Sequence, residues 1–449
     1  MDPAWELINP DAAGIDIGSR EHWVCVPVRR AEKNVRPFGT FTADLEALAD
    51  WLQECGVKTV AMEATGVYWI PVFQILERRG FQAVLVNARQ TKNVAGRKTD
   101  VKDCQWIQRL HTYGLLQGSF RPEDKYCVVR TYLRYRDELV SARSTQCQHL
   151  QKALQQMNVQ LHHVLSDVSG VSGWRIIEAI LDGQRDPVKL AAMVDRRVRA
   201  SQETIQKALV GDYRPEHLFV LKSAFELYHT YEAKIKACDE QILVEVAKLP
   251  DRVDVKVKPL PARKEGRPAC VDKMLHQDMR AELYPKFGVD LTAIEGIGVL
   301  TELVILTEVG PDVSRFPSEK HFASWLGLCP DQRISGGKVL SSRTRRVINR
   351  VSDALRLAAM TLERSQSALG AFYRRMKAKL GAAEAVTATA HKLARLIYRL
   401  LKYGEAYVRQ GMADYEKKFQ DRKLFALQKT AKTMGFELVS RQATTPAVS

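Results

Sequence analysis

The stretch that decides the fold of the first domain is Ala13 to Val28, AGIDIGSREHWVCVPV. Two short apolar runs, residues 13–18 and 23–28, are rich in β-branched side chains and are separated by a polar turn, which predicts a β-hairpin. Asp16 stands in the middle of the first run, between Ile15 and Ile17. A charge on a core strand is costly unless it is paired or binds a metal ion, so Asp16 is a candidate functional residue.

Outward from this hairpin, strands and helices alternate up to about residue 125. We expect a third strand at 36–41, a helix capped by Thr42 and ended by Gly56, and a strand at 59–62. A helix at 69–79, a strand at 83–86 and a helix from about Asp100 follow. Three strands followed by alternating helices and strands are typical of a ribonuclease-H-like, or RuvC-like, mixed sheet. The fold class is therefore α/β over residues 10–125.

Three further acids stand at element ends in this domain. Glu63 ends the strand at 59–62, and Asp100 and Asp103 open the last helix with both carboxylates on one side. In such a sheet the first and fourth strands end side by side under that helix, so we expect all four acids to converge and to bind two Mg²⁺ ions. Taken singly, Glu63 is explained as a surface loop residue, and Asp100 with Asp103 as a helix-capping pair.

The middle of the chain predicts long helices. One heptad-like seam runs through Cys147, Leu150, Leu154, Met157, Leu161 and Val164, and a second through Tyr228, Tyr231, Ile235, Cys238 and Ile242. The pattern fits two helices packed within one chain as well as it fits a dimerising coiled coil. We expect a helical and coiled-coil region at 126–250, a basic linker or insertion at 251–289, a helical domain at 290–430 and a flexible tail at 431–449.

The charge balance indicates a polyanionic partner. The chain has 68 Lys and Arg against 52 Asp and Glu, a net charge of +16. Such an excess favours binding to nucleic acid, although a basic enzyme with a solvated surface remains the alternative. Residues 333–350 hold the densest basic stretch, and Gly296 with Gly298 resembles a helix-hairpin-helix turn that admits a phosphate. The candidate nucleic-acid contacts are Gly296, Gly298, Arg333, Lys338, Arg343, Arg345 and Arg346.

Other classes are disfavoured by what the sequence lacks. No uncharged apolar stretch is long enough for a membrane span, and the N-terminus has no signal-peptide pattern, so we expect a cytoplasmic protein without membrane contact. The eight cysteines form no CxxC spacing. Neither a disulfide framework nor a structural zinc site is therefore expected.

Several motifs together resemble a known family. They are Gly14-Ile15-Asp16, residues 62–66 (MEATG), residues 98–103 (KTDVKD), residues 294–298 (IEGIG), and residues 327–330 (GLCP) followed by Ser335-Gly336. In order and spacing the chain resembles the DEDD transposases of insertion sequences that are guided by a bridge RNA, which are related to Piv-type invertases. The resemblance covers residues 12–125 and about 290–405.

The resemblance implies a mechanism. Asp16, Glu63, Asp100 and Asp103 match the metal-binding acids of a RuvC-like domain, and Ser335 matches the serine that attacks a DNA phosphate and forms a phosphoserine intermediate. It also implies donor and target DNA, a guide RNA, and a dimer or tetramer whose active sites join residues of different protomers. The protein would then be bacterial or archaeal and associated with the nucleoid.

Rival interpretations remain open. Without the resemblance Ser335 is a turn serine, and Ser341 and Ser342 are equally good nucleophiles. A RuvC-type Holliday-junction endonuclease would use the same acids with water, and a non-catalytic DNA- or RNA-binding protein would need only the basic surface.

Overall fold

The computed structural model describes residues 7–64, 66–87, 100–262, 278–345, 347–405, 417, 420–421 and 424–437. The chain forms two compact units, Met1–Arg121 and Pro122–Ser449. Within the described ranges no helix is long and apolar enough to span a membrane. Residues 263–277 of the predicted linker and 438–449 of the predicted tail lie outside the described residues.

The first unit is built on a five-stranded mixed sheet in the order β3-β2-β1-β4-β5. Its elements are β1 (Ala12–Ile17), β2 (Glu21–Cys25), η1 (Val28–Arg30), β3 (Val35–Gly39), α1 (Thr42–Glu54), β4 (Thr59–Glu63), α2 (Trp69–Arg78), β5 (Gln82–Val86) and α4 (Asp100–Thr112). Strands β3, β2 and β1 are antiparallel, whereas β4 and β5 run parallel to β1. The predicted order of three strands followed by alternating helices and strands is confirmed.

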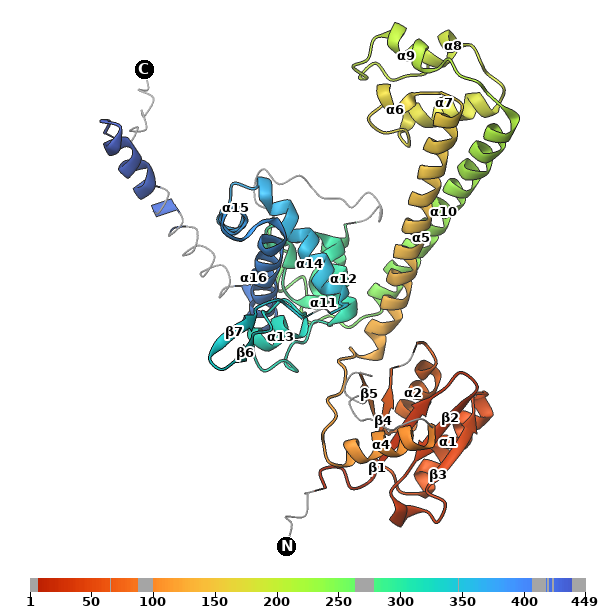
Figure 1. Cartoon of the computed structure of the whole chain (residues 1–449), viewed down its shortest axis with the longest axis vertical. Helices are drawn as coiled ribbons and strands as arrows, with labels where there is room; N and C mark the ends of the chain where they lie inside the picture. Colours follow the sequence, from red (N-terminus) through yellow and green to blue (C-terminus); the bar gives the residue numbers. More distant parts are fainter. Residues whose placement is uncertain are drawn as a thin grey trace. The chain divides into compact units, whose positions relative to one another are not determined.

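The two faces of this sheet are covered by different helices (Figure 1). Ile15 and Met62 belong to the core under α1 and α2, whereas Ala61 packs with Ile107 of α4. The opposite face therefore holds the residues that alternate with Ile15 and Met62, because successive strand residues point to opposite sides.

The start of α1 differs in detail from its prediction. Thr42 is the first helical residue, and Phe41 occupies the cap position. The Phe41 backbone N–H donates to Oδ2 of Asp44 at 3.2 Å. Asp44 therefore satisfies the helix start in the place that we had assigned to the Thr42 hydroxyl.

The second unit is helical apart from one short hairpin. Its elements are α5 (Asp124–Gln156), α6 (Leu161–Val164), α7 (Val171–Leu181), α8 (Pro187–Ala191), α9 (Gln202–Ala208), α10 (Pro215–Ala247), α11 (Met279–Phe287), η2 (Leu291–Ala293), α12 (Val299–Glu308), α13 (Glu319–Trp325), β6 (Arg333–Ser335), β7 (Lys338–Ser341), α14 (Arg350–Thr361), η3 (Leu362–Arg364), α15 (Ala368–Leu380) and α16 (Ala382–Tyr403).

Helices α5 and α10 pair with each other within the chain (Figure 1). Their contact buries an ion pair between Arg136 and Asp239. Helix α5 ends at Gln156, earlier than the predicted seam, because Asn158 adopts a left-handed conformation with φ of 57°. Leu161 and Val164 therefore lie on the separate helix α6. Of the two arrangements left open, the structure has the intramolecular one.

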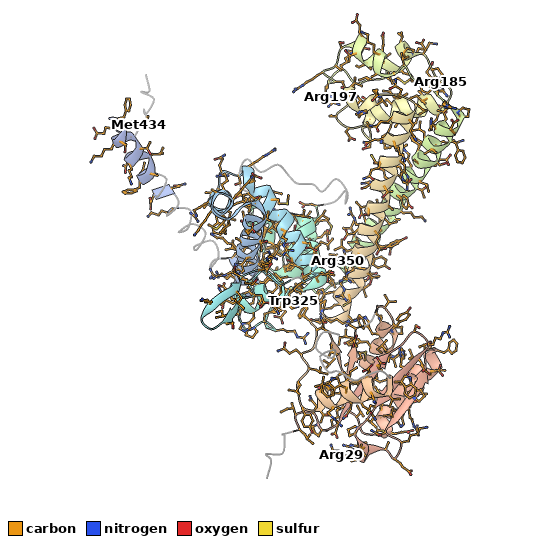
Figure 2. The ribbon with its side chains drawn as sticks, in the orientation of Figure 1. Arg29, Arg185, Arg197, Trp325, Arg350 and Met434 are labelled. Atoms are coloured by element: carbon orange, nitrogen blue, oxygen red, sulfur yellow. The ribbon has the colours of Figure 1, made fainter. Side chains whose placement is uncertain are left out.

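The segment between the long helices folds into a small helical tip. Helices α6 to α9 share a core with the adjoining ends of α5 and α10, including Met157, Ile177 and Leu221. The guanidinium of Arg185 stacks 4.6 Å from the centre of the Tyr213 ring, and its position at this tip is labelled in Figure 2. This part of the predicted helical region 126–250 thus consists of short helices.

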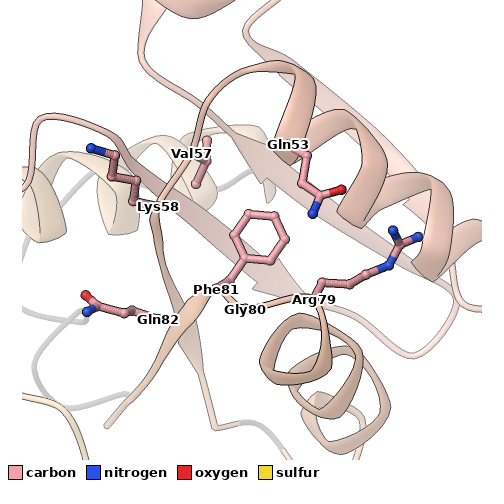
Figure 3. A pocket seen from close by; sticks show the side chains of 7 residues that line it. All are labelled: Gln53, Val57, Lys58, Arg79, Gly80, Phe81 and Gln82. Carbon is pink, nitrogen blue, oxygen red and sulfur yellow. The ribbon is translucent and has the colours of Figure 1, made fainter.

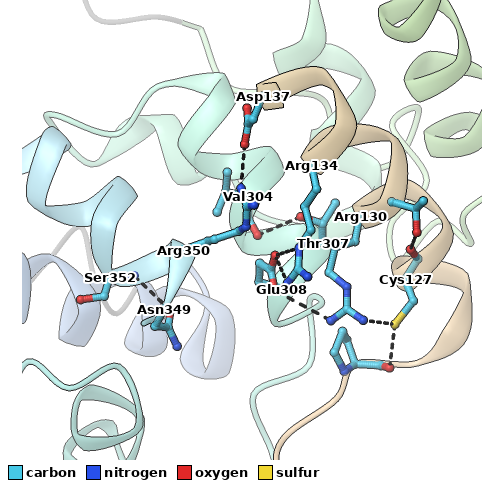
Figure 4. Close-up of polar contacts among 12 residues, drawn as sticks. Cys127, Arg130, Arg134, Asp137, Val304, Thr307, Glu308, Asn349, Arg350 and Ser352 are labelled. Carbon is cyan, nitrogen blue, oxygen red and sulfur yellow. Dashed lines mark hydrogen bonds and ion pairs between the residues drawn. The ribbon is translucent and has the colours of Figure 1, made fainter. Parts of the chain in front are cut away.

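The first half of α5 is fastened to the C-terminal helices by ion pairs (Figure 4). Nη2 of Arg134 lies 2.8 and 2.9 Å from the two carboxylate oxygens of Glu308 on α12. Nη1 of Arg350, the first residue of α14, donates to Oδ2 of Asp137 at 2.9 Å. Charged residues therefore join segments that lie up to 213 residues apart in the sequence.

Two elements depart from the helical and linker assignments made for this region. Residues Met279–Phe287, inside the predicted linker, form α11, whose Arg280 is buried and pairs with Asp290. Residues 333–341 form the hairpin β6-β7 inside the domain that we expected to be helical. Its sequence signal is Gly336-Gly337 with Ile334 and Val339 one position further out on either side, a pattern typical of a two-residue hairpin turn.

Candidate active site

Two of the four predicted acids end neighbouring parallel strands. Strands β1 and β4 pair in register up to Ile15 and Met62, so Asp16 and Glu63 stand one position beyond that pair. Both are partly buried. Because they alternate with Ile15 and Met62, their side chains leave the sheet on the face that α4 covers.

Helix α4 runs antiparallel to β1 and brings its first turn toward Asp16. Its last turn meets the chain before β1, where Nδ2 of Asn9 donates to the carbonyl oxygen of His111 at 2.8 Å. Further along, Nε2 of Gln108 donates to the carbonyl oxygen of Ala12 at 3.3 Å. The next contact joins Gly14 to Cys104. If this register continues, Asp103 and the start of α4 at Asp100 lie beside Asp16 along the strand.

Gly14 makes the close approach of α4 possible. A Cβ built at Gly14 would collide with the backbone nitrogen of Gln108 and the carbonyl oxygen of Cys104. The backbone of α4 therefore fills the space beside Gly14.

A hydrogen bond between side chains holds the other end of α4. Oγ1 of Thr59, at the start of β4, and Nε2 of His111 lie 2.8 Å apart, and both residues are buried. Burial lowers the pKa of His111, which favours the neutral ring. Sequence reasoning missed this pair, because a single histidine on a helix gives no sign of a partner 52 residues earlier.

The negative charge of Asp16 has an electrostatic effect on a residue near the start of α4. A hydrogen bond with Cys25 and burial raise the pKa of the Cys104 thiol, and the negative charge of Asp16 raises it further. Cys104 follows Asp103 directly on α4, so Asp16 lies close enough to this part of the helix to act on the Cys104 thiol.

The donor chemistry of these residues fits a divalent cation. Carboxylate oxygens are the ligands that Mg²⁺ prefers. Among the described residues, however, no three His, Cys, Asp or Glu side chains are arranged to hold a metal ion. The backbone thus brings Asp16, Glu63 and Asp103 to one end of one sheet face. The side chain of Asp100 lies outside the described residues.

Ser335 is the last residue of β6 and stands directly before the turn of the hairpin. It pairs with Lys338 across the Gly336-Gly337 turn and is exposed. Both glycines have positive φ, 55° and 76°, which this tight turn requires. The Ser335 hydroxyl is thus presented next to the tip of a hairpin.

The two alternative serines have different surroundings. Oγ of Ser341 accepts a hydrogen bond from the backbone N–H of Arg343 at 3.3 Å, and Ser341 is partly buried. Ser342 is exposed and follows the end of β7. Ser335 is the serine nearest the hairpin tip.

The structure gives the two candidate glycines different roles. Gly296 has φ of 88°, and a Cβ there would press on the carbonyl oxygen of Ala358 in α14 at 3.0 Å. Gly296 is thus required for a tight turn between packed helices. Gly298 caps α12 and has nothing within 4 Å of a built Cβ.

The basic candidates are likewise divided. Lys338 and Arg343 are exposed. Arg345 donates through Nη2 to both the carbonyl oxygen and Oγ of Ser324 at 2.9 Å, so it also holds the chain that follows the hairpin. Arg346 and the side chain of Arg333 lie outside the described residues.

A shallow hollow in the first unit lies away from the acids (Figure 3). It is lined by Gln53, Val57, Lys58, Arg79, Gly80, Phe81 and Gln82. Val57 and Lys58 precede β4, whereas Glu63 ends it. The hollow is therefore at the opposite end of the parallel strands, and no candidate active-site residue lines it.

Comparisons with known proteins give the family of both segments that carry these sites. Residues 13–159 match a family model described as "Transposase", whose name specifies the DEDD type of IS110, and residues 290–374 match "Transposase IS116/IS110/IS902 family". The "Insertion element IS110 uncharacterized 43.6 kDa protein" of Streptomyces coelicolor is 30% identical over 119 residues. That match covers 26% of this chain and 29% of the relative. The two matched segments are thus similar to transposase domains of the IS110 family.

Proposed function

We propose that the chain is a transposase that cuts and rejoins DNA for the movement of an insertion sequence. The observation that carries this proposal is the placement of Asp16 and Glu63 at adjacent positions of two neighbouring parallel strands, on the face that α4 covers, in a segment that matches a DEDD transposase. The first unit supplies the RuvC-like acidic site, and the hairpin of the second unit supplies a serine.

Asp16, Glu63, Asp100 and Asp103 would hold Mg²⁺, as a pair of ions in the proposed site. Bound there, the ions would supply positive charge to a scissile phosphate and lower the cost of bringing the carboxylates together. The side chains would have to turn toward one another, which the partial burial of Asp16, Glu63 and Asp103 at the sheet edge permits.

Ser335 is the proposed nucleophile. Its Oγ forms a bond to phosphorus while the bond from phosphorus to a deoxyribose oxygen breaks, and the proton of the hydroxyl passes to solvent as the freed strand end takes one up. Attack by a strand-end hydroxyl on the phosphoserine reverses these steps and joins the DNA. Lys338 and Arg333 stand beside Ser335 in the hairpin and would hold the phosphate.

We further propose that a bridge RNA directs this chemistry and that the active protein is a dimer or tetramer. Support for both comes from the motif resemblance, together with the excess of positive charge, which suits binding to RNA as well as DNA. Sequencing the RNA that copurifies with the protein tests guidance. A specific, structured RNA is expected, and a random sample of cellular RNA would contradict it.

The reaction is tested on DNA duplexes that match unpaired segments of that RNA, with Mg²⁺ present. We expect a covalent protein–DNA adduct on a denaturing gel, and peptide mapping should place the DNA on Ser335. Ser335→Ala should remove the adduct and leave nucleic-acid binding intact, whereas Ser341→Ala and Ser342→Ala should keep it. DNA mapped to Ser341 or Ser342 would move the nucleophile. Nicked DNA without an adduct would indicate the nuclease that uses water. The absence of both nicks and adduct would indicate a binding protein.

The acidic site is tested in the same assay. Asp16→Asn, Glu63→Gln and Asp103→Asn should each reduce strand cleavage by at least roughly a hundredfold, since each removes a charged ligand of a shared metal site. Glu54→Gln, at the end of α1 on the other face of the sheet, is the matched control and should keep activity. Near-normal cleavage by two of the three variants would contradict the shared site.

A further inference from the structure

The hairpin β6-β7 has exposed apolar and basic side chains that its own folding does not require. Built Cβ atoms at Gly336 and Gly337 would have nothing within 4 Å, so there is open space beside both turn residues. Figure 1 shows β6 and β7 extending from the helices of the second unit. A two-stranded hairpin by itself is only marginally stable in water. Its exposed side chains therefore suggest a contact with a partner.

The base of the hairpin is firmly attached. The backbone N–H of Asp331 donates to the carbonyl oxygen of Arg343 at 2.9 Å, which extends the ribbon beyond the two strands. A Cβ at Gly327 would come within 2.8 Å of Val347, so the returning chain passes directly over the end of α13. Together with the hydrogen bonds from Arg345 to Ser324, these contacts give the tip a rigid support.

Two apolar side chains on this ribbon face solvent. Ile334 is 59% exposed and Leu340 is 69% exposed. The register steps from Arg333↔Ser341 to Ile334↔Val339, so Leu340 is the extra residue of a β-bulge. Bulges re-aim side chains, and an exposed apolar residue at one is a candidate contact for a partner.

The charge around these side chains identifies the kind of partner. Residues 332–352 contain Lys and Arg but no Asp or Glu, and Lys338 and Arg343 are exposed beside the apolar pair. A second copy would present the same positive charge and be repelled. A nucleic-acid duplex instead offers phosphates for the cations, and sugars and base faces for the apolar side chains.

We propose that the β6-β7 hairpin is a wedge that enters a groove of the DNA duplex, with Ile334 and Leu340 against sugars and bases. Lys338 and Arg343 contact the flanking phosphates. The inference rests on the proposed function for the identity of the duplex as DNA, but it does not require Ser335 to be the nucleophile.

The first test separates apolar contact from electrostatic attraction. The full chain is titrated with a mixed-sequence DNA duplex of about 30 base pairs at several salt concentrations. Ile334→Ser with Leu340→Ser should weaken binding roughly tenfold and leave the slope of log K against log salt unchanged, because no charge is lost. Lys338→Ala with Arg343→Ala should reduce the slope by about 2. Val257→Ser, at a position 83% exposed in a loop, is the control and should bind as the unaltered chain.

A second readout reports on the DNA itself. Duplexes that contain 2-aminopurine should become more fluorescent when the chain unstacks their bases, and the Ile334→Ser, Leu340→Ser variant should lose this increase even at saturating protein. Binding and fluorescence that are unaltered in this variant would overturn the wedge. The wedge would also be overturned if sedimentation showed loss of self-association as the only effect of this variant. A second copy of the chain would then be the partner that covers the hairpin. Apolar-dependent binding without a covalent adduct would reject the proposed transposase chemistry and keep the wedge.

Discussion

Glu302 is a carboxylic acid enclosed completely in the second unit. It lies on α12 and is 1% exposed, near Asp290 and Arg280. Burial raises its pKa well above the ordinary 4.5, and the negative charge of Asp290 adds to the effect. A hydrogen bond from the Leu291 backbone and the charge of Arg280 act in the opposite direction. Burial prevails because the Leu291 hydrogen bond and the Arg280 charge together do not replace the lost hydration.

Replacing Glu302 by Gln should make the protein less sensitive to alkaline pH. The folded chain holds this proton above pH 4.5, where the unfolded chain loses it, so the free energy of unfolding falls as pH rises from 4.5 toward the raised pKa. The loss approaches about 1.4 kcal/mol per pH unit in that window. Gln stays neutral and keeps an acceptor for Leu291. Calorimetry should show a higher unfolding temperature for Glu302→Gln at pH 8, with the difference shrinking toward pH 4.5; parallel pH profiles would contradict the assignment.

At the scale of elements, the position of α4 on β1 decides whether acidic residues can meet. Three contacts set the register of this pair: Asn9 with His111, Ala12 with Gln108, and Gly14 with Cys104. Only a residue without a side chain allows the last of them. The identity of one residue on β1 therefore controls the approach of a helix from more than eighty residues later in the chain.

Gly14→Ala should push the first turns of α4 away from the sheet. A methyl group forced into closely packed backbone typically costs about 1–3 kcal/mol. Hydrogen–deuterium exchange should therefore speed up in peptides that cover residues 100–112, and strand cleavage should fall with it. Exchange in α5, which belongs to the other unit, serves as the internal control and should not change. Unaltered exchange in α4 would show that the helix does not depend on this glycine.

At the scale of the whole molecule, the proposed reaction needs groups from both compact units. The acids belong to Met1–Arg121, and Ser335 belongs to Pro122–Ser449. If active sites join different protomers, each chain gives its acids to one site and its serine to another. Two defective chains could then complement each other.

Mixing Asp16→Ala chains with Ser335→Ala chains should restore adduct formation, since a mixed oligomer then contains one site with intact acids and an intact serine. Each variant alone should give none. In randomly formed dimers, half of the dimers are mixed and half of the sites in these are complete, so the expected yield is roughly a quarter of that of the unaltered protein. If the mixture stays inactive after the chains have been refolded together, both groups must act within one chain.

The sequence by itself determined the element order of the first unit and the sites of its acids. Strands such as Ala12–Ile17 and Thr59–Glu63 are short, apolar and β-branched, and the helices between them have a clear apolar face. Parallel strands end at the same sheet edge, so the neighbourhood of Asp16 and Glu63 followed from that order. These features depend on local pattern and on general rules of chain connection.

Only the tertiary structure decided which surfaces pair. The seams of α5 and α10 suit a partner in the same chain or in another, because packing depends on side-chain shape and not on connectivity. Burial of the charged groups Arg136, Arg280 and Glu302 was invisible in the sequence, since each depends on residues brought close by folding. The exposure of Ile334 and Leu340 was hidden as well. An apolar residue in a sequence predicts a buried side chain. Only the position of the hairpin relative to its neighbours decides whether that side chain is buried within the chain or is left exposed to a partner.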